Sequence, residues 1–461
     1  MDQSLVFDPA LIARYDRSGP RYTSYPTAVQ FHEGFGETDY LAVARASNDS
    51  GRPLSLYFHL PFCDTVCYYC ACNKVVTKDR GLAPPYLVRL HRELTLQGQL
   101  FDRTRIVTQL HWGGGTPTFL SHDQMAELMM ETRRHFSLQD DDSGEYSIEI
   151  DPREANADTV ALLRRLGFNR MSLGVQDFHP QVQQAVNRIQ SVEETLAVLK
   201  AARTEGFRSI SIDLIYGLPF QTVASFSATL KRILDIAPDR LSVFNYAHLP
   251  ERFKPQRRIQ AADLPSPQER LDILHMTGDT LTAAGYVFIG MDHFARPEDE
   301  LAVAQRQGTL YRNFQGYSTH ADCDLVGLGV TAISKVGATY AQNQRDLEGY
   351  YRCLDAGRLA VFRGVALSRD DEIRRDIITR LISHFELSFA AIEARWGLAF
   401  REAFRSEIEA LAALCQDGLL DLDEYSVRVR PAGRLLIRNI CMVFDRYLPE
   451  SGQPVRFSRV I

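Results

Sequence analysis

Short apolar runs alternate with amphipathic stretches through the first two thirds of the chain. The apolar runs lie at 54–60, 106–112, 146–150, 170–175, 209–215 and 241–247. Between them, helical periodicity is found near 83–99, 121–136, 157–166, 190–205, 222–236 and 266–284. Repeated strand–helix units predict a parallel sheet with right-handed crossovers. Six units are two short of a closed (β/α)8 barrel, so we expect an α/β fold built on a partial (β/α)6 TIM-like barrel.

The alternation fades after about residue 290, where Gly, His and Asp become frequent. Beyond 366 the pattern is helical at 369–385, 388–396 and 401–416, followed by two short strand patterns around a turn and a helix at 431–447. This order predicts a mainly helical, winged-helix-like C-terminal domain. The expected divisions are an arm at 1–53 covering the active site, the barrel at 54–290, its extension at 291–365 and the C-terminal domain at 366–461.

Composition is that of an ordinary globular protein, with 45% hydrophobic and 24% charged residues in 461. A net charge of −6 argues against a nucleic-acid partner. The first residues lack the basic and apolar regions of a signal peptide, and no apolar run is as long as a membrane span. We therefore expect a cytoplasmic protein without a membrane span.

Four of the eight cysteines follow the first predicted strand within ten residues. Cys63, Cys67 and Cys70 form C-x3-C-x2-C, and Cys72 comes two positions later. Three thiolates on one short loop suit a [4Fe–4S] cluster with one iron left open for another ligand. If Cys72 joined them, the four would suit a closed structural zinc site. Spacing alone leaves both possibilities open.

Polar residues also end the other predicted strands. Because the carboxyl ends of parallel strands meet at one mouth, these residues are expected to gather there. Asp213 is notable because a carboxylate within a buried strand needs a partner or a cavity. The candidates are Gly113–Thr116 after the second strand, Glu149 and Asp151, Gln176 and Asp177, Asp213, and 245–248.

An arm rich in Gly, Pro, Ser and Tyr occupies residues 18–27. Within it, Arg21 stands directly before Tyr22, and Tyr25 follows three positions after Tyr22. A cation flanked by aromatic rings suits a flat, anionic ligand. Arg21 is therefore our sequence-based candidate for binding substrate carboxylates.

Taken together, these motifs resemble the radical S-adenosylmethionine enzymes. Tyr69 before the third cysteine and the G-G-G-T-P turn after the second strand belong to that pattern. Within the superfamily, the chain is similar to the oxygen-independent coproporphyrinogen III oxidase (coproporphyrinogen dehydrogenase) family. The further motifs are S-G-P-R-Y-T-S-Y-P-T-A, C-Y-Y-C-A-C-N-K, H-W-G-G-G-T-P-T, S-V-F-N-Y-A-H-L-P, G-M-D-H-F-A-R-P and the C-terminal F-S-R-V-I.

The resemblance implies a [4Fe–4S] cluster and two molecules of S-adenosyl-L-methionine. It implies hydrogen abstraction by a 5′-deoxyadenosyl radical from two propionates of coproporphyrinogen III. Loss of CO2 then leaves vinyl groups, giving protoporphyrinogen IX in haem (porphyrin) biosynthesis. An electron donor for the cluster and an electron acceptor of unknown identity are implied as partners, and we expect a monomer.

The resemblance also assigns residues. Cys63, Cys67 and Cys70 would bind the cluster. Tyr57, His59 and Cys72 would lie at the catalytic centre. The first S-adenosylmethionine would contact Tyr57, Gly114, Glu149, Arg188 and Ile333. The second site, or the space between the two, would be lined by Tyr69, Gly115, Thr116, Gln176, Asp213 and Ala247.

Two other functions remain as alternatives. A haem chaperone of the same superfamily would share cluster and barrel, but would be expected to lack the long arm and Cys72. A tRNA-modifying radical enzyme is suggested by the wing-like C-terminus, although the negative net charge disfavours it. With the resemblance in place, a zinc site is no longer favoured.

Overall fold

Contacts divide the chain into two units, each assembled from separate segments. The barrel unit comprises residues 31–266 and 322–366, and the terminal unit comprises 1–30, 267–321 and 367–461. The computed structural model describes residues 5–321, 323–448, 457 and 459. Three of the five residues in the C-terminal motif at 457–461 lie outside this set. This division does not test the four domain limits expected from the sequence, which stay predictions.

All six predicted strands form and lie side by side in the barrel unit, in the order β1-β4-β5-β6-β7-β8. Every neighbouring pair is parallel. The predicted α/β class and partial barrel are therefore confirmed. The strands are β1 Leu54–Leu60, β4 Val107–Gly114, β5 Glu145–Ile150, β6 Arg170–Gln176, β7 Ser209–Tyr216 and β8 Arg240–Asn245.

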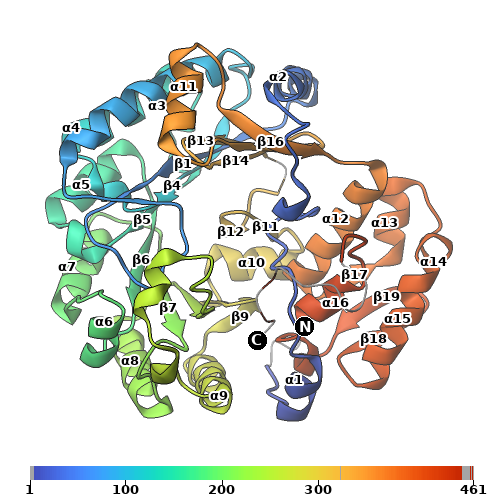
Figure 1. Ribbon diagram of the computed structural model, residues 1–461. Coiled ribbons are helices and arrows are strands. Elements are labelled where there is room, and N and C mark those ends of the chain that lie inside the picture. The colour runs from blue at the N-terminus through green and yellow to red at the C-terminus, as the bar shows by residue number, and fades with distance from the viewer. Residues whose placement is uncertain (1–4, 322, 449–456, 458, 460–461) are drawn as a thin grey trace. The chain divides into compact units, whose positions relative to one another are not determined.

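The helices between these strands cover the outside of the sheet (Figure 1). They begin at strong caps: Ser121, Asn156, Ser191 and Thr222 each accept a hydrogen bond from the third residue of the following helix. Gly167 ends α5 in the left-handed conformation, as the sequence predicts. The helices are α3 Ala83–Gly98, α4 His122–His135, α5 Ala157–Leu166, α7 Val192–Thr204 and α8 Val223–Ile236.

The sheet of the barrel unit continues on the other side of β1, which the sequence pattern did not predict. Strand β13 pairs with β1 in parallel, and β14, β15 and β16 follow antiparallel. These strands are short, and all of β13 is buried, so no apolar–polar alternation marks it. Their bounds are β13 Asp324–Leu328, β14 Ile333–Val336, β15 Thr339–Asn343 and β16 Val361–Ala366. The remaining elements of the unit are α2 Glu37–Ala46, β2 Phe62–Cys63, β3 Val75–Val76, α6 Pro180–Ala185 and α11 Leu347–Asp355.

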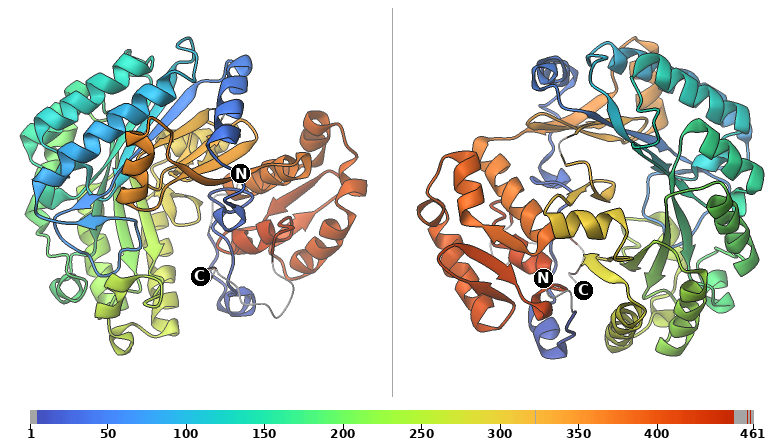
Figure 2. Two further views of the ribbon diagram at one scale, coloured as in Figure 1. Left: turned by 45° about the horizontal axis from the view of Figure 1, so that its top comes forward. Right: turned by 180° about the vertical axis from the view of Figure 1, so that it is seen from behind.

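The C-terminal part of the terminal unit is helical around a small antiparallel sheet of order β17-β19-β18 (Figures 1 and 2). The predicted winged-helix-like architecture is thus confirmed. The predicted helix at 431–447 is wrong for most of its length, because only Ile437–Met442 (α16) is α-helical. Pro431 and Gly433 form a 3-10 turn, and a Cβ on Gly433 would lie 2.1 Å from the Leu419 carbonyl oxygen.

The other elements of the terminal unit come from three parts of the chain. Those before residue 321 are α1 Pro9–Tyr15, α9 Pro267–Ala283, β9 Val287–Gly290, β10 His293–Ala295, α10 Glu300–Gln307, β11 Tyr311–Asn313 and β12 Gly316–Ser318. Those after 367 are α12 Arg369–His384, β17 Glu386–Ser388, α13 Phe389–Trp396, α14 Phe400–Ala403, α15 Arg405–Gln416, β18 Leu420–Leu422 and β19 Ser426–Val429. Among the described residues, no helix combines the length and apolarity needed to cross a bilayer.

A buried carboxylate, Glu93 of α3, joins that helix to the strands beyond β1. It accepts hydrogen bonds from the Tyr350 hydroxyl at 2.6 Å, the Asn343 amide at 2.7 Å and the Gly329 N–H at 2.7 Å. Burial raises the pKa of Glu93 to about 7, although these hydrogen bonds oppose the shift. The network therefore titrates in the neutral range.

We predict that Glu93 makes the stability of the barrel unit fall between pH 5.5 and pH 8. A carboxyl whose pKa rises on folding binds more protons in the folded state, so its contribution is present at low pH and lost above the folded pKa. With a shift from 4.5 to about 7, that loss is about 2 kcal/mol. Urea unfolding of wild type and Glu93→Gln at both pH values measures it.

The Glu93→Gln protein cannot titrate at this position, so the stability of wild type relative to this variant should fall by about 2 kcal/mol from pH 5.5 to pH 8. Glu193→Gln, at an exposed position on α7, is the matched control and should show no such change. A difference that stays constant from pH 5.5 to pH 8 would contradict the prediction.

Candidate functional site

The cysteine loop is held closed directly after β1. Strand β2 pairs with β3, so the two ends of the loop that carries the cysteines lie side by side. The Val75 N–H donates to the Pro61 carbonyl at 2.7 Å and the Thr77 N–H donates to that of Cys63 at 2.9 Å. The three predicted cluster ligands therefore lie on one constrained loop at the carboxyl end of β1.

The glycine turn after β4 is fastened to this loop by backbone hydrogen bonds. The Gly115 N–H donates to the Leu60 carbonyl at 2.8 Å, and the Thr116 N–H donates to that of Phe62 at 2.7 Å. A Cβ on Gly115 would lie 2.5 Å from the Phe62 carbonyl oxygen. The approach of the two segments thus requires glycine at 115.

Two of the cysteines receive polar contacts from near neighbours. The Thr116 hydroxyl donates to the Cys63 sulfur at 3.7 Å. A hydrogen bond from the Cys72 thiol lowers the pKa of Cys70 to about 5, and Lys74 adds to the effect. Lys74 Nζ also donates to the Cys70 carbonyl at 3.0 Å. Cys72, the exposed cysteine of the loop, is a neighbour of the predicted ligands.

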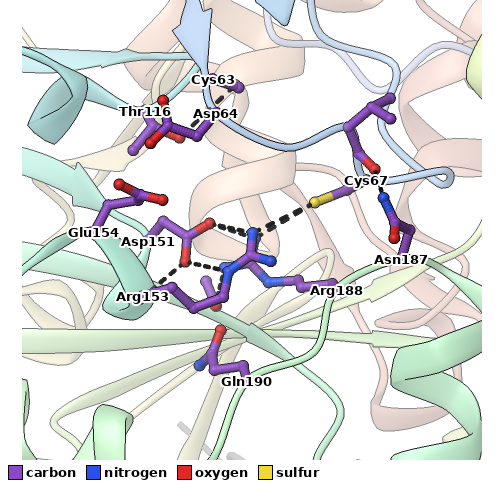
Figure 3. A network of polar contacts seen from close by, with 12 residues as sticks. Cys63, Asp64, Cys67, Thr116, Asp151, Arg153, Glu154, Asn187, Arg188 and Gln190 are labelled. Carbon is purple, nitrogen blue, oxygen red and sulfur yellow. Dashed lines mark hydrogen bonds and ion pairs between the residues drawn. The ribbon is translucent and has the colours of Figure 1, made fainter. Parts of the chain in front are cut away.

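Cys67 faces two guanidinium groups that share one carboxylate (Figure 3). Arg188 Nη1 lies 3.6 Å from the Cys67 sulfur and 2.9 Å from Asp151 Oδ2. Arg153 Nη2 lies 3.9 Å from the same sulfur and 2.6 Å from Asp151 Oδ2. Although burial opposes ionisation, the two arginines keep the pKa of Asp151 below its usual value. The two arginines and Asp151 together leave an excess of positive charge beside Cys67.

Arg153 was not among the residues predicted from the sequence. It stands two positions after Asp151, within the segment already identified as a strand end. The strand-end pattern indicated the carboxylates of this segment as candidates, but nothing in it distinguished the arginine. Only the fold of Pro152–Glu154, a single 3-10 turn, shows that Arg153 reaches the cysteine loop.

The chemistry of the loop fits an iron–sulfur cluster. All four of its cysteines are free of disulfides. Hydrogen-bond donors lie beside two of the sulfurs, the Thr116 hydroxyl at Cys63 and the Arg188 guanidinium at Cys67, and donors of this kind to the sulfurs are a feature of cluster sites. Burial raises the pKa of Cys63 to about 11, although the hydrogen bond from Thr116 opposes the shift. Within the described chain, no three His, Cys, Asp or Glu side chains converge on a point that could hold a single metal ion. A cluster differs from a single ion in that its thiolates bind separate irons.

Tyr57 and His59 of β1 are linked by a defined hydrogen-bond chain. The His59 ring bonds the Asn73 carbonyl through Nε2 at 3.0 Å and the Tyr57 hydroxyl through Nδ1 at 3.1 Å. Because a carbonyl only accepts, Nε2 carries the proton and Nδ1 accepts from Tyr57. Burial lowers the pKa of His59, so the ring is neutral at pH 7. Tyr57 also stacks on His111, with ring centroids 5.8 Å apart.

Glu149 lies beside the glycine turn, where the sequence prediction placed it. Its Oε2 accepts the Gly114 N–H at 3.0 Å, and its Oε1 lies 3.3 Å from His111 Nε2. Desolvation opposes its ionisation, but the hydrogen bonds from His111 and Gly114 hold its pKa below the usual range. Glu149 is therefore an anion at neutral pH, suited to binding an ammonium group.

Asp213 lies two strands away from Glu149, on β7. Its Oδ2 accepts the Ser172 hydroxyl at 2.9 Å. Burial raises the pKa of Asp213 to about 6, and the nearby charge of Glu149 adds to the shift. In the sheet, Asp213 is in register with Gly174 of β6 on one side and Ser242 of β8 on the other.

Several buried polar atoms near the carboxyl ends of β6 and β8 have no hydrogen-bond partner in the described chain. They are Gln176 Oε1, Arg188 Nε and Asn245 Oδ1. Buried polar atoms are normally paired, so these indicate groups that a ligand would satisfy. Amino-acid and nucleoside moieties such as those of S-adenosylmethionine supply suitable partners. Gln176 also adopts a positive φ of 70°, which bends the strand end there.

The other predicted site residues lie on separate segments that the barrel unit brings near the loop. Gln256 Nε2 donates to the carbonyl oxygens of Tyr69 at 2.9 Å and Ala247 at 3.2 Å, which joins the loops that carry them. Gln256 itself was missed because nothing in the sequence distinguishes it. Ile333 begins β14, and its carbonyl would lie 2.7 Å from a Cβ on Gly327, which pairs with Tyr57.

Comparison with known proteins identifies two family models. The model of the radical SAM superfamily matches residues 57–233. The model described as the HemN C-terminal domain matches residues 367–436. The first covers five of the six parallel strands, including the cysteine loop, and the second covers most of the helical C-terminus.

Relatives match over the whole chain. Proteins named oxygen-independent coproporphyrinogen III oxidase are 58% identical in Pseudomonas aeruginosa, over 100% of both chains, and 55% identical in Escherichia coli, over 100% of this chain and 99% of that one. The solved structure described as coproporphyrinogen III oxidase (HemN) from Escherichia coli, a radical SAM enzyme, has a TM-score of 0.92 at 53% identity. It covers 96% of this chain and 100% of that chain.

We predict that Gly115→Ala separates the cysteine loop from the glycine turn. The added Cβ meets backbone atoms of Pro61 and Phe62, which cannot move without displacing the loop. Overpacking of this kind costs about 1–3 kcal/mol. Urea unfolding should show that loss, and iron per chain after anaerobic reconstitution should fall.

Gly36→Ala is the matched control, because a Cβ there meets nothing within 4 Å and its φ of −121° suits any residue. It should retain wild-type iron content. Equal iron and equal stability in Gly115→Ala and Gly36→Ala would refute the argument for close approach.

Proposed function

The chain belongs to the oxygen-independent coproporphyrinogen III oxidase family of radical SAM enzymes, and on this premise we propose how its own residues serve the reaction. It is an oxidoreductase whose substrate is coproporphyrinogen III. The observation that carries the assignment is identity of 58% over the full length of a relative with that name. These relatives do not favour the haem-chaperone alternative.

On each of two propionates, the net change is the loss of CO2, one hydrogen atom and one electron, which leaves a vinyl group. When bound, the cluster and S-adenosylmethionine supply one-electron chemistry that removes hydrogen from an unactivated carbon. The remaining electron goes to an acceptor, and a separate donor reduces the cluster. The protein's part is to bind, orient and exclude water.

Cys63, Cys67 and Cys70 would hold the cluster and leave one iron open. Arg153 and Arg188 place positive charge beside the Cys67 sulfur, where it would offset the negative charge of a cluster-bound thiolate. Asp151 orients both guanidinium groups. Cys72 is a neighbour and not a ligand in this proposal.

S-adenosylmethionine would bind across the carboxyl ends of the strands. For the first molecule, Glu149 would accept the ammonium group, with Tyr57, Gly114, Arg188 and Ile333 around it. A second molecule would be lined by Tyr69, Gly115, Thr116, Gln176, Asp213 and Ala247. The spare polar atoms of Gln176 and Arg188 support this arrangement.

Tyr57 and His59 would act as a rigid, neutral pair. Because the Asn73 carbonyl fixes the His59 tautomer, the Tyr57 hydroxyl is held as a donor to His59. A neutral ring and a raised tyrosine pKa keep extra charge away from the radical-generating centre. We propose that they position the bound cofactor.

An anaerobic assay tests the proposed function directly. Reconstituted enzyme with coproporphyrinogen III, S-adenosylmethionine and a reductant should form vinyl products together with 5′-deoxyadenosine. Cys67→Ser should lose both products and most of its iron, because one cluster ligand is removed.

Cys415→Ser is the control, since Cys415 lies far from the cysteine loop in the sequence and is not a predicted ligand. Its activity should equal that of wild type. Haem binding without any vinyl product would favour a chaperone, and stoichiometric zinc without iron would refute the cluster.

We further predict that the affinity for S-adenosylmethionine rises with pH through Asp213. With a pKa of about 6, Asp213 is largely protonated at pH 5 and ionised at pH 7. If the carboxylate accepts hydrogen bonds from the ligand, the Kd should fall about tenfold over that range. Glu149 and Arg188 are the other charges that act on Asp213.

Anaerobic equilibrium dialysis of Asp213→Asn measures this dependence. The asparagine does not titrate, so the variant should bind weakly at both pH values with a nearly constant Kd. Asp235→Asn, exposed on α8, should keep the wild-type pH dependence. The same slope in Asp213→Asn and wild type would exclude Asp213 as its source.

A further inference from the structure

Arg312, in β11 of the terminal unit, is a buried cation with spare hydrogen-bond donors. It is 6% exposed, yet its Nε and Nη1 atoms have no partner in the part of the chain that the structure describes. Its guanidinium does lie over the Tyr317 ring, 4.8 Å from the centroid. The Tyr317 side chain also hydrogen-bonds the guanidinium, but it supplies no negative charge at neutral pH. A desolvated cation without an anionic partner is unfavourable unless a ligand provides one.

The same hairpin carries a second polar group of this kind. Gln315, in the turn between β11 and β12, has both its side-chain oxygen and nitrogen buried without partners among the described residues. Its backbone N–H is fixed by Asn313 Oδ1 at 2.8 Å, so the turn is ordered. Four unsatisfied atoms within four residues point to a polar ligand that meets this hairpin.

Neighbouring arginines of the terminal unit already have partners. Arg438 donates to the carbonyl oxygens of Gly19, Pro20 and Arg459 and so fastens the N-terminal arm. Arg21, the substrate-binding candidate from the sequence, is ion-paired with Asp292. Both have partners for their charge or donors within the chain, whereas Nε and Nη1 of Arg312 have none among the described residues.

The hairpin is also a firm support. Tyr311 and Asn313 pair with Ser318 and Gly316, and β11 packs against α12. The Tyr317 hydroxyl donates to the Ile382 carbonyl at 2.8 Å, which fixes the ring beneath the guanidinium. The arginine is therefore held in place before any ligand arrives, as a binding residue should be.

We propose that Arg312 binds a carboxylate of the substrate through its spare N–H groups. This inference rests on the proposed function, since coproporphyrinogen III presents four propionates and is the anionic macrocycle of that reaction. Guanidinium–carboxylate pairing is the interaction that best satisfies such donors. S-adenosylmethionine also carries a carboxylate, so the test separates the two ligands.

Arg312→Met removes the cation and keeps much of the apolar volume. With reconstituted enzyme, we expect the KM for coproporphyrinogen III to rise about 10- to 100-fold, the loss of one charged hydrogen-bonding partner. The Kd for S-adenosylmethionine should stay at the wild-type value. The melting temperature of the substrate-free protein should be unchanged or higher, because an unpaired buried charge has been removed.

Arg306→Met, at an exposed position on α10, is the matched control and should leave the KM and both affinities unchanged. Arg312→Lys keeps the charge with fewer donors and should give an intermediate KM. A wild-type KM for coproporphyrinogen III in Arg312→Met would overturn the proposal. A raised Kd for S-adenosylmethionine without a raised KM for coproporphyrinogen III would overturn it as well. A lowered melting temperature with an unchanged KM would instead assign Arg312 a structural role.

A binding titration, which needs no turnover, tests the role of Arg312 separately from the proposed function. Coproporphyrin III and its tetramethyl ester, titrated by absorbance, differ in their carboxylates. Wild type should prefer the acid, and Arg312→Met should lose that preference. If wild type forms no vinyl product, the proposed function fails while the acid preference still tests Arg312. If wild type turns over and Arg312→Met binds both forms as wild type does, the inference alone fails.

Discussion

The contact on which the candidate site depends is the backbone join between the segment after β1 and the turn after β4. Gly115 and Thr116 donate to the carbonyl oxygens of Leu60 and Phe62. A parallel sheet brings the carboxyl ends of these strands together, and glycine lets them touch. The cysteine loop, Thr116 and Glu149 take their positions from that join. The site is therefore a property of the sheet and not of the loop alone.

Charge is distributed around the join in a consistent way. Arg153 and Arg188 lie beside Cys67, while the carboxylates of Glu149 and Asp213 lie further along the strand ends. Cations next to a sulfur ligand offset the negative charge that a metal-bound thiolate carries, and carboxylates away from it can receive an ammonium group or hydroxyls. The carboxyl ends of the strands can in this way bind two groups of different charge, and radical SAM chemistry needs a cluster and S-adenosylmethionine side by side.

Apolar runs were sufficient to predict the six parallel strands, and periodicity predicted the helices between them because each helix buries one stripe. It could not predict β13–β16, whose short runs include buried polar residues such as Asp324, Ser334 and Asn343, nor the break at Pro431. For the site, residue type and strand-end position predicted the cysteines, Glu149 and Asp213. Arg153 and Gln256 could not be predicted, since their roles come from a turn and from a join between loops. Those contacts exist only after folding.

Both units contain buried polar atoms that lack a hydrogen-bond partner among the described residues. Gln176, Arg188 and Asn245 in the barrel unit, and Arg312 in the terminal unit, hold donors or acceptors that have no hydrogen-bond partner in the described part of the chain. A buried polar atom that makes no hydrogen bond costs free energy on folding. A ligand that forms hydrogen bonds with these atoms gains binding free energy from them. Such positions are thus better guides to ligand contacts than the ion pair of Arg21, whose charge the chain has already neutralised.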